Sequence, residues 1–203
     1  MYNGFERANL GSGSMCLDGF LNIDWPPGHL DGIKPDRKSD NVVYRTPDLY
    51  MDITSLNKIP NGSFSYIRAC HTLEHFCISR TRLILKEWTR ILSIGGTIDI
   101  VVPDFDIIIE RYLDKTGRYD QWWEETKNDK GLWYDTPEKK PLMSKEHAMF
   151  ELMYLNGHHK AFFNFTFLKQ LLGEHNIKNI HKYENNIMDT ALCNYSLCVK
   201  GDK

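Results

Sequence analysis

Residues 7–14 have the sequence Arg-Ala-Asn-Leu-Gly-Ser-Gly-Ser, and residues 20–24 have the sequence Phe-Leu-Asn-Ile-Asp. Together they predict a short strand, a glycine turn, a second strand and a closing carboxylate. Glycine lets the backbone approach a ligand closely, and a carboxylate after the next strand can accept hydrogen bonds from two ribose hydroxyls. The pattern therefore indicates a site for a nucleoside-bearing cofactor.

The spacing of this pattern departs from that of dinucleotide-binding enzymes. Asp24 follows Gly11 by 13 residues, whereas the dinucleotide fingerprint places its acid about 20 residues on, behind a full crossover helix. Little more than one helical turn fits here, and the third glycine is absent. The alternative interpretation is an ordinary tight turn with a solvated aspartate.

Several segments follow in a fixed order. Residues 50–53 form a short apolar segment that contains a second acid, Asp52. Residues 64–70 alternate as a strand does, and residues 80–91 carry apolar side chains at helical spacing. Two glycines at 95–96 are expected to end that helix, and a buried strand then runs to Pro103.

These motifs together resemble class I S-adenosylmethionine-dependent methyltransferases, especially small stand-alone members linked to surface-glycan synthesis. The resemblance covers residues 7 to about 110 and the tail from 162 to 200. The sequence differs from the residues usual in this family at Ser12, Ser65 and Ser93-Ile94. The motifs that carry the resemblance are Leu10-Gly11-Ser12-Gly13, Asp24, Asp52, His71-Thr72-Leu73-Glu74-His75, Leu92-Ser93-Ile94-Gly95-Gly96-Thr97-Ile98 and Val102-Pro103-Asp104.

The resemblance implies one α/β domain over residues 1–203, with a Rossmann-like sheet that is mostly parallel and has one antiparallel strand. Residues 104–162 would form a helical, substrate-binding insertion after strand five. The implied cofactor is S-adenosyl-L-methionine, with S-adenosyl-L-homocysteine as the product. The residues implied to bind the cofactor are Leu10, Gly11, Ser12, Gly13, Asp24, Trp25, Asp52, Ile53, Cys70 and His71.

Composition agrees with such a domain. The chain has 203 residues, of which 41% are hydrophobic, and a net charge of −2. Basic residues are mixed with acidic ones, which argues against a nucleic-acid-binding protein. The odd number of cysteines, five, without metal-finger spacing favours a reduced compartment. No apolar run or leader suggests a membrane span or secretion, so we expect a cytoplasmic protein.

The remaining sequence predicts a long loop over residues 25–46, helices in the insertion and a final antiparallel pair of strands. The expected loop contains several glycines and prolines. Ser144 is suited to cap the helix that begins there. The helices are expected at 106–115, 119–127, 144–155 and 167–175, and the strands at 177–183 and 191–200.

Methyl transfer to a hydroxyl needs positioning of the acceptor and removal of its proton. Ligands of open α/β sheets lie beyond the carboxyl ends of the strands, where His71 and Asp104 are expected. His71 is the predicted base, with Asp104 orienting or replacing it; His158 is an alternative. A histidine that only supports the local structure is the competing interpretation of His71.

The same segment raises the question of a metal. In a helix that begins near His71, the side chains of His71, Glu74 and His75 would share one face and could ligate a divalent ion. Some ubiquinone-pathway O-methyltransferases resemble this arrangement, while many relatives have Leu-Glu-His without a metal. We expect no metal in catalysis, because sulfonium transfer needs no Lewis acid.

The insertion is rich in aromatic residues, which stack on the apolar faces of sugar rings. We predict a small-molecule acceptor, preferably a sugar or glycan. The alternative is that the tryptophans attach the insertion to the core or to a second subunit of a homodimer. The predicted substrate-binding residues are Trp122, Trp133, Tyr134 and His159.

The sequence thus favours an O-methyltransferase acting on a sugar hydroxyl. A methyltransferase for a non-sugar small molecule is one alternative. A nicotinamide-dependent oxidoreductase would share the glycine turn but should have the longer first crossover. A catalytically silent scaffold would have no need of Gly11, Gly13, Asp24 and Asp52.

Overall fold

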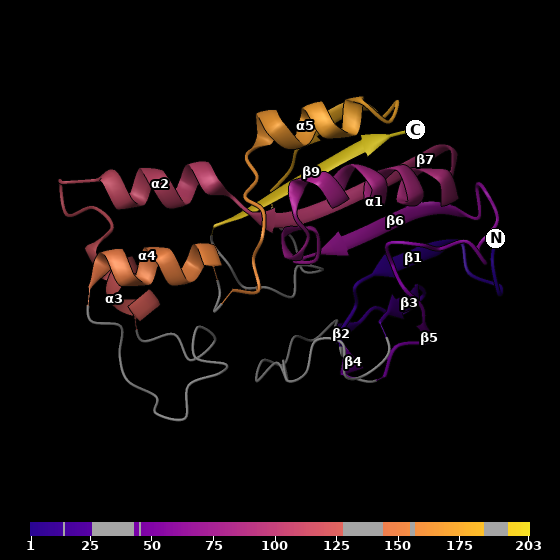
Figure 1. The fold of residues 1–203 in the computed structure, drawn as a ribbon, viewed down its shortest axis with the longest axis horizontal. Coiled ribbons are helices and arrows are strands. Elements are labelled where there is room, and N and C mark those ends of the chain that lie inside the picture. The colour runs from indigo at the N-terminus through magenta and orange to yellow at the C-terminus, as the bar shows by residue number, and fades with distance from the viewer. Residues whose placement is uncertain (14, 26–42, 45, 128–143, 155–156, 185–194) are drawn as a thin grey trace.

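The computed structural model describes residues 1–13, 15–25, 43–44, 46–127, 144–154, 157–184 and 195–203. They form a seven-stranded sheet in the order β5-β3-β1-β6-β7-β9-β8, with a two-stranded sheet of β2 and β4 beside it (Figure 1). The strands are β1 (Arg7–Leu10), β2 (Met15–Cys16), β3 (Leu21–Asp24), β4 (Val43–Tyr44), β5 (Leu49–Tyr50), β6 (Phe64–Cys70), β7 (Leu92–Pro103), β8 (Lys178–Lys182) and β9 (Ser196–Asp202).

Strands β5, β3, β1, β6 and β7 are parallel, and β9 pairs antiparallel with both β7 and β8. Ile67 of β6 pairs with Ala8 of β1 and Ile98 of β7, so the centre of the sheet is apolar. All three side chains are fully buried. This mostly parallel sheet with one antiparallel strand confirms the predicted fold class.

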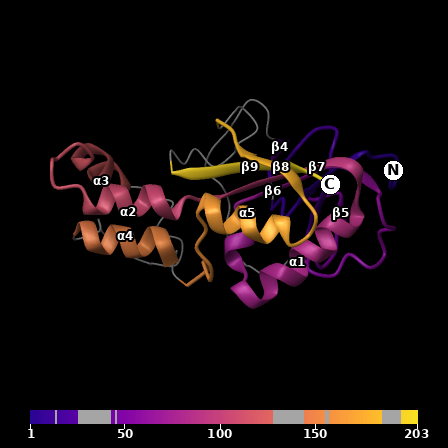
Figure 2. The ribbon, with the colours of Figure 1, turned by 90° about the horizontal axis from the view of Figure 1, so that it is seen from above.

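Helices α1 (Ile78–Ile91) and α5 (Phe165–Gly173) lie on the same side of the sheet (Figure 2). Helix α1 buries Ile84, Leu85 and Trp88 in the main core, as expected for an amphipathic helix packed on a sheet. The indole nitrogen of Trp88 donates a 2.8 Å hydrogen bond to the carbonyl of Ile53. This bond satisfies a polar group that burial would otherwise leave without a partner.

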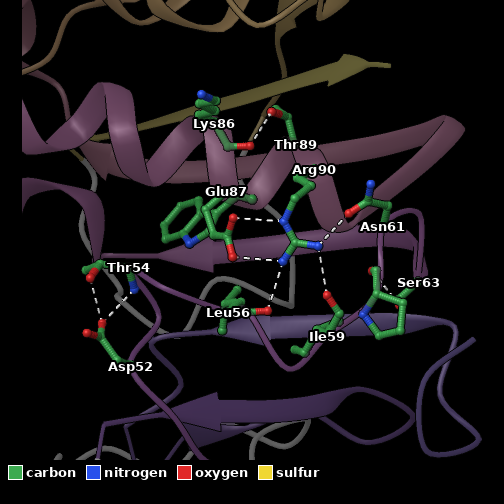
Figure 3. Close-up of polar contacts among 12 residues, drawn as sticks. Asp52, Thr54, Leu56, Ile59, Asn61, Ser63, Lys86, Glu87, Thr89 and Arg90 are labelled. Atoms are coloured by element: carbon green, nitrogen blue, oxygen red, sulfur yellow. Dashed lines mark hydrogen bonds and ion pairs between the residues drawn. The ribbon is translucent and has the colours of Figure 1, made fainter.

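The connection between β5 and β6 is held against α1 by Arg90 (Figure 3). The guanidinium of Arg90 donates to the carbonyls of Leu56 and Ile59, at 2.9 and 2.8 Å, and to the side-chain oxygen of Asn61 at 2.7 Å. Glu87, one turn earlier on α1, pairs with the same guanidinium at 2.8 Å. The segment that precedes β6, which has no regular secondary structure, is thereby fixed to the C-terminal end of α1.

The sheet also carries a buried charged network. Arg68 on β6 and Asp99 on β7 form an ion pair at 2.7 Å and are 1% and 0% exposed. The hydroxyls of Tyr66 and Tyr183 donate to Asp99, each at 2.6 Å. Burial, reinforced by the charge of Asp99, raises the pKa of both tyrosines. Both hydroxyls therefore remain donors, and the carboxylate is fully paired.

A helical lobe stands beyond the ends of β6 and β7 (Figures 1 and 2). It consists of α2 (Phe105–Leu113), α3 (Asp120–Lys127) and α4 (Lys145–Tyr154). Trp123 is 2% exposed, and its indole nitrogen donates to the carbonyl of Arg111 at 3.0 Å. The lobe has a small core of its own, formed by Ile108, Trp123, Ala148, Met149 and Leu152.

The predicted elements are found with two corrections. Helix α1 ends at Ile91, before Gly95 and Gly96, which lie within β7. The helix ends because Leu92 already has extended dihedral angles. No helix begins near His71, because that residue has a φ of 48° and the following turn, η1 (Leu73–His75), is a single 3₁₀ turn.

The other predicted helices correspond to α2, α3, α4 and α5, and Ser144 caps α4 as expected, since its hydroxyl accepts from His147 N at 3.1 Å. Strands β8 and β9 pair antiparallel, also as expected. Most of the predicted loop 25–46 and residues 191–194 lie outside the described residues. None of the described helices combines the length and apolarity that crossing a bilayer requires.

Candidate active site

The glycine turn after β1 lies between β3 and the loop that follows β6. Gly11 and Gly13 have φ values of 69° and 54°, in the left-handed region that glycine adopts without strain. A Cβ atom on Gly11 would lie 2.3 Å from the Cγ2 atom of Thr72. The amides of Gly11 and Ser12 both donate to the carbonyl of Ile23. Close packing therefore requires glycine at position 11.

Asp24 closes this turn. Its carboxylate accepts hydrogen bonds from the backbone amides of Gly13 and Trp25, the latter at 2.6 Å. Burial raises the pKa of Asp24, and these two amide bonds partly offset the increase. Of the two glycines predicted to act with this acid, Gly13 is thus in direct contact with it.

Asp52 lies beside Asp24 at the same edge of the sheet. Its Oδ1 atom accepts from the indole nitrogen of Trp25 at 2.8 Å and from the amide and hydroxyl of Thr54. Burial would raise the pKa of Asp52, but the bonds from Thr54 and Trp25 lower it overall. The ring of Trp25 meets Phe76 edge to face, with 5.7 Å between centroids. Two carboxylates, those of Asp24 and Asp52, and two aromatic rings, those of Trp25 and Phe76, therefore lie together at this edge.

His71 follows β6 and lies between an acid and a hydroxyl. Its Nδ1 atom is 3.1 Å from Oε1 of Glu74, and its Nε2 atom is 3.0 Å from Oγ of Ser196 on β9. Burial would raise the pKa of Glu74, but the neighbouring histidines, His71 foremost, lower it to about 2. An ionised carboxylate only accepts, so Nδ1 of His71 donates to Glu74, and Nε2 is the ring nitrogen that faces the hydroxyl of Ser196.

Asp104 is 2% exposed and caps α2, since its Oδ1 atom accepts from Asp106 N at 3.0 Å. Its Oδ2 atom lies 3.5 Å from Nζ of Lys182. The position beyond β7 agrees with the sequence-based prediction. The geometry shows an acid that fixes the first turn of the lobe.

The two adjacent histidines before α5 have different surroundings. His158 is partly exposed, and its carbonyl accepts from Nδ1 of His75 at 3.1 Å. His159 is 8% exposed, with Nδ1 bonded to the carbonyl of Met153 at 3.1 Å and Nε2 4.0 Å from Glu74. Burial lowers the pKa of His159 to about 4. Its ring faces Glu74 and His75, although it was predicted to bind the acceptor.

The remaining predicted residues divide into four groups. Leu10 and Ile53 are core residues, 0% and 3% exposed, and both belong to the main core cluster. Ser12 and Cys70 lie in the turn and at the end of β6, beside Gly11 and Thr72. Trp122 is partly exposed in the lobe. The predicted residues outside the described part of the chain are Trp133 and Tyr134.

Sequence reasoning did not identify three residues that shape the site. Ser196 faces His71 from a strand 125 residues later in the chain. Glu74 contacts His71, although it was considered only as a metal ligand. Thr72 contacts the glycine turn, and its hydroxyl donates to the carbonyl of Leu10 at 3.3 Å. Only Glu74, three residues after His71, was detectable from spacing.

The residues at this edge fit a nucleoside cofactor. The carboxylates of Asp24 and Asp52 are acceptors of the kind that ribose hydroxyls and an adenine amino group need, and the indole of Trp25 contacts Asp52. Among the described residues, chain neighbours aside, only the Asp24 carboxylate lies within 4 Å of the position where a Cβ on Gly13 would lie. This set of donors and acceptors is compatible with an adenosine site.

Comparison with known proteins gives structural matches only. No family model matches the chain, and no curated protein matches its sequence. A SAM-dependent methyltransferase from Archaeoglobus fulgidus superposes with a TM-score of 0.52 and 13% identity, over 100% of this chain and 88% of that one.

Two larger proteins also superpose. The CurJ carbon methyltransferase matches at a TM-score of 0.50 and 13% identity, over 98% of this chain and 48% of its own. Human N-acetylserotonin methyltransferase, in complex with SAM, matches at 0.50 and 11%, over 97% of this chain and 47% of its own. The chain spans about half the length of these two. It has the class I fold of S-adenosylmethionine-dependent methyltransferases.

Proposed function

We propose that this chain is an S-adenosylmethionine-dependent O-methyltransferase that methylates a hydroxyl group of a sugar or glycan. The observation that carries the proposal is the pair formed by His71 and Glu74, in which the far ring nitrogen of His71, Nε2, lies 3.0 Å from the Ser196 hydroxyl. This pair lies at the strand ends, beside the adenosine-type site.

The chain's own residues would hold the cofactor at that edge. Asp24 would accept from the ribose, Asp52 with Ile53 would lie beside adenine, and the turn from Leu10 to Gly13 would lie under the amino-acid portion. When bound, S-adenosylmethionine supplies an electrophilic methyl group on a sulfonium. Because that electrophile is already activated, the protein contributes mainly positioning and proton removal.

His71 would remove the proton from the acceptor hydroxyl. Its Nε2 atom already contacts a hydroxyl, that of Ser196 at 3.0 Å, so an acceptor hydroxyl placed there would be within transfer distance. Glu74 holds the proton on Nδ1 and stabilises the imidazolium that forms. Glu74 is therefore a positioning residue, and His71 is the proposed base.

The lobe would bind the acceptor. Trp122 is its partly exposed aromatic residue next to Tyr195, with 6.2 Å between ring centroids. Tyr195 directly precedes β9, which carries Ser196. Asp104 fixes the start of α2, and His158 lies in the loop that returns from α4. A sugar ring stacked on the lobe could thus present a hydroxyl to His71.

A non-sugar small molecule is the second candidate, and one contact favours it. The guanidinium of Arg111 lies 4.4 Å from the ring centroid of Trp122, which covers one face of that indole. Stacking of a sugar on that face would require Arg111 to move. A planar acceptor that binds in the remaining space would not.

The proposal is tested by methyl transfer from labelled S-adenosylmethionine to a panel of rhamnose-, fucose- and hexose-containing glycans, with phenols and small acids as competitors. We expect an O-methylated sugar and an equal amount of S-adenosylhomocysteine. Methylation of a phenol or an acid, with every glycan unmodified, would contradict the sugar acceptor and leave the methyltransferase activity in place.

A further inference from the structure

Three side chains of types that commonly bind metals lie close together next to the candidate active site. Glu74 and His75 belong to η1, and His159 lies in the loop after α4. One ligand atom from each lies within 4.8 Å of the other two. The rings of His75 and His159 are 5.1 Å apart at their centroids. Two distant parts of the chain thus supply one donor set.

Both histidines are fixed in the tautomer that a metal requires. Nδ1 of His75 lies 3.1 Å from the carbonyl of His158, and Nδ1 of His159 lies 3.1 Å from the carbonyl of Met153. A carbonyl only accepts, so each Nδ1 carries a proton and Nε2 is the ring nitrogen that is left to bind a metal. A backbone carbonyl bound to the far nitrogen is the usual support of a metal-ligating histidine.

The carboxylate between them lacks partners. Glu74 is 1% exposed, and apart from the ion pair of its Oε1 atom with His71, neither oxygen has a hydrogen-bond partner in the described part of the chain. Nε2 of His159 is 4.0 Å away from Oε1, which is too long for a hydrogen bond. A buried carboxylate in this state is costly unless a cation compensates it.

We propose that Glu74, His75 and His159 bind one divalent transition-metal ion, for which Zn²⁺ is the first candidate. Imidazole nitrogen and carboxylate oxygen are zinc ligands, with bonds of about 2.0–2.2 Å, so two donors on one ion are at most about 4.3 Å apart. The 4.0 Å between Nε2 of His159 and Oε1 of Glu74 is within this limit. The ligand atoms of the three residues lie up to 4.8 Å apart, and a small rotation of the side chains would bring the most widely separated pair within the same limit.

This ion would join the lobe to the sheet, which goes beyond the proposed methyl transfer. The amides of Lys160 and Ala161 already donate to the carbonyl of Glu74, at 2.7 and 3.1 Å. One ion bound by both His159 and the Glu74 carboxylate would link the same two segments a second time. The metal is therefore structural, and its loss should lower the melting temperature.

The first test uses the untagged full chain after dialysis against a chelator. Calorimetric titration with Zn²⁺ should give one ion per chain, and X-ray absorption of the zinc-loaded protein should show imidazole scattering without sulfur. Absence of binding, or sulfur scattering from a cysteine such as Cys70 or Cys77, would overturn the assignment. This measurement needs no variant and does not depend on how substitutions fold.

The second test compares His159→Ala with His181→Ala, which removes an exposed imidazole from β8. Zinc affinity should fall at least about tenfold in the first variant, as expected for loss of one of three ligands, and stay unchanged in the second. Zinc should also raise the melting temperature of the parent chain and of His181→Ala only. Equal affinity in both variants would contradict the site.

Discussion

The strand-end edge and the helical lobe are built on different principles. At the edge, polar groups are held by hydrogen bonds and ion pairs from near and distant residues, as His71 is held by Glu74, three residues later, and by Ser196 on β9. In the lobe, aromatic side chains pack around Trp123 in a separate small core. The edge therefore has one geometry imposed by the sheet, whereas the lobe can change its surface with little effect on the sheet.

This difference assigns the two regions different kinetic roles. Groups at the edge should govern turnover and cofactor affinity, and groups in the lobe should govern acceptor affinity. Substitutions that change only the quantities assigned to one region would support this division of roles. Substitutions that change turnover, cofactor affinity and acceptor affinity together would contradict it.

The largest effect is expected at His71. Because its φ is 48°, His71→Asn is the better variant, since asparagine tolerates the left-handed region and alanine does not. Loss of a general base should lower turnover by about 10²–10⁴, with S-adenosylhomocysteine affinity nearly unchanged. Steady-state kinetics and calorimetry together measure both quantities. Near-normal turnover would remove His71 as the base.

The next effect is expected at Asp24. Asp24→Ala removes acceptors for the ribose hydroxyls, worth about 1.5–3 kcal/mol for bonds to a charged group, so cofactor binding should weaken about tenfold or more. The matched control is Asp18→Ala, an exposed acid in the turn before β3. A dissociation constant equal to that of the control would overturn the placement of the ribose.

A smaller effect is expected in the lobe. Trp122→Leu removes a stacking surface, and an aromatic contact of about 0.5–1.5 kcal/mol corresponds to a rise in acceptor KM of about two- to tenfold, with turnover largely kept. A lower melting temperature with unchanged KM would instead show that Trp122 only attaches α3 to the rest of the lobe.

The smallest effect on chemistry is expected from chelation. Well below the melting temperature, turnover should persist after exhaustive chelator treatment, because methyl transfer from a sulfonium needs no Lewis acid. Initial rates with and without chelator check this directly. Loss of turnover that a divalent ion restores would make the metal catalytic and would blur the division between the two regions.

Local patterns predicted the elements well. The glycine turn, Asp24 and the strand over residues 64–70 all lie where the sequence placed them, because strand alternation and glycine turns depend on neighbouring residues. The resemblance to class I methyltransferases implied a mostly parallel sheet with one antiparallel strand, which periodicity alone does not give.

Contacts between distant segments could not be predicted. The meeting of His159 with Glu74, and of Ser196 with His71, depends on how α4 and β9 return to the sheet. Arg68 is another example, because the strand pattern placed it on β6 without revealing that Asp99 would neutralise it in the interior. Its burial depends on a partner 31 residues away.

The most direct test of the account is a calorimetric titration of the full chain with S-adenosylhomocysteine, followed by the nicotinamide dinucleotides. The account predicts one saturable site for S-adenosylhomocysteine, weakened in Asp24→Ala, and no heat of binding with either dinucleotide. Binding of a dinucleotide with no response to S-adenosylhomocysteine would contradict it and favour an oxidoreductase on the same sheet.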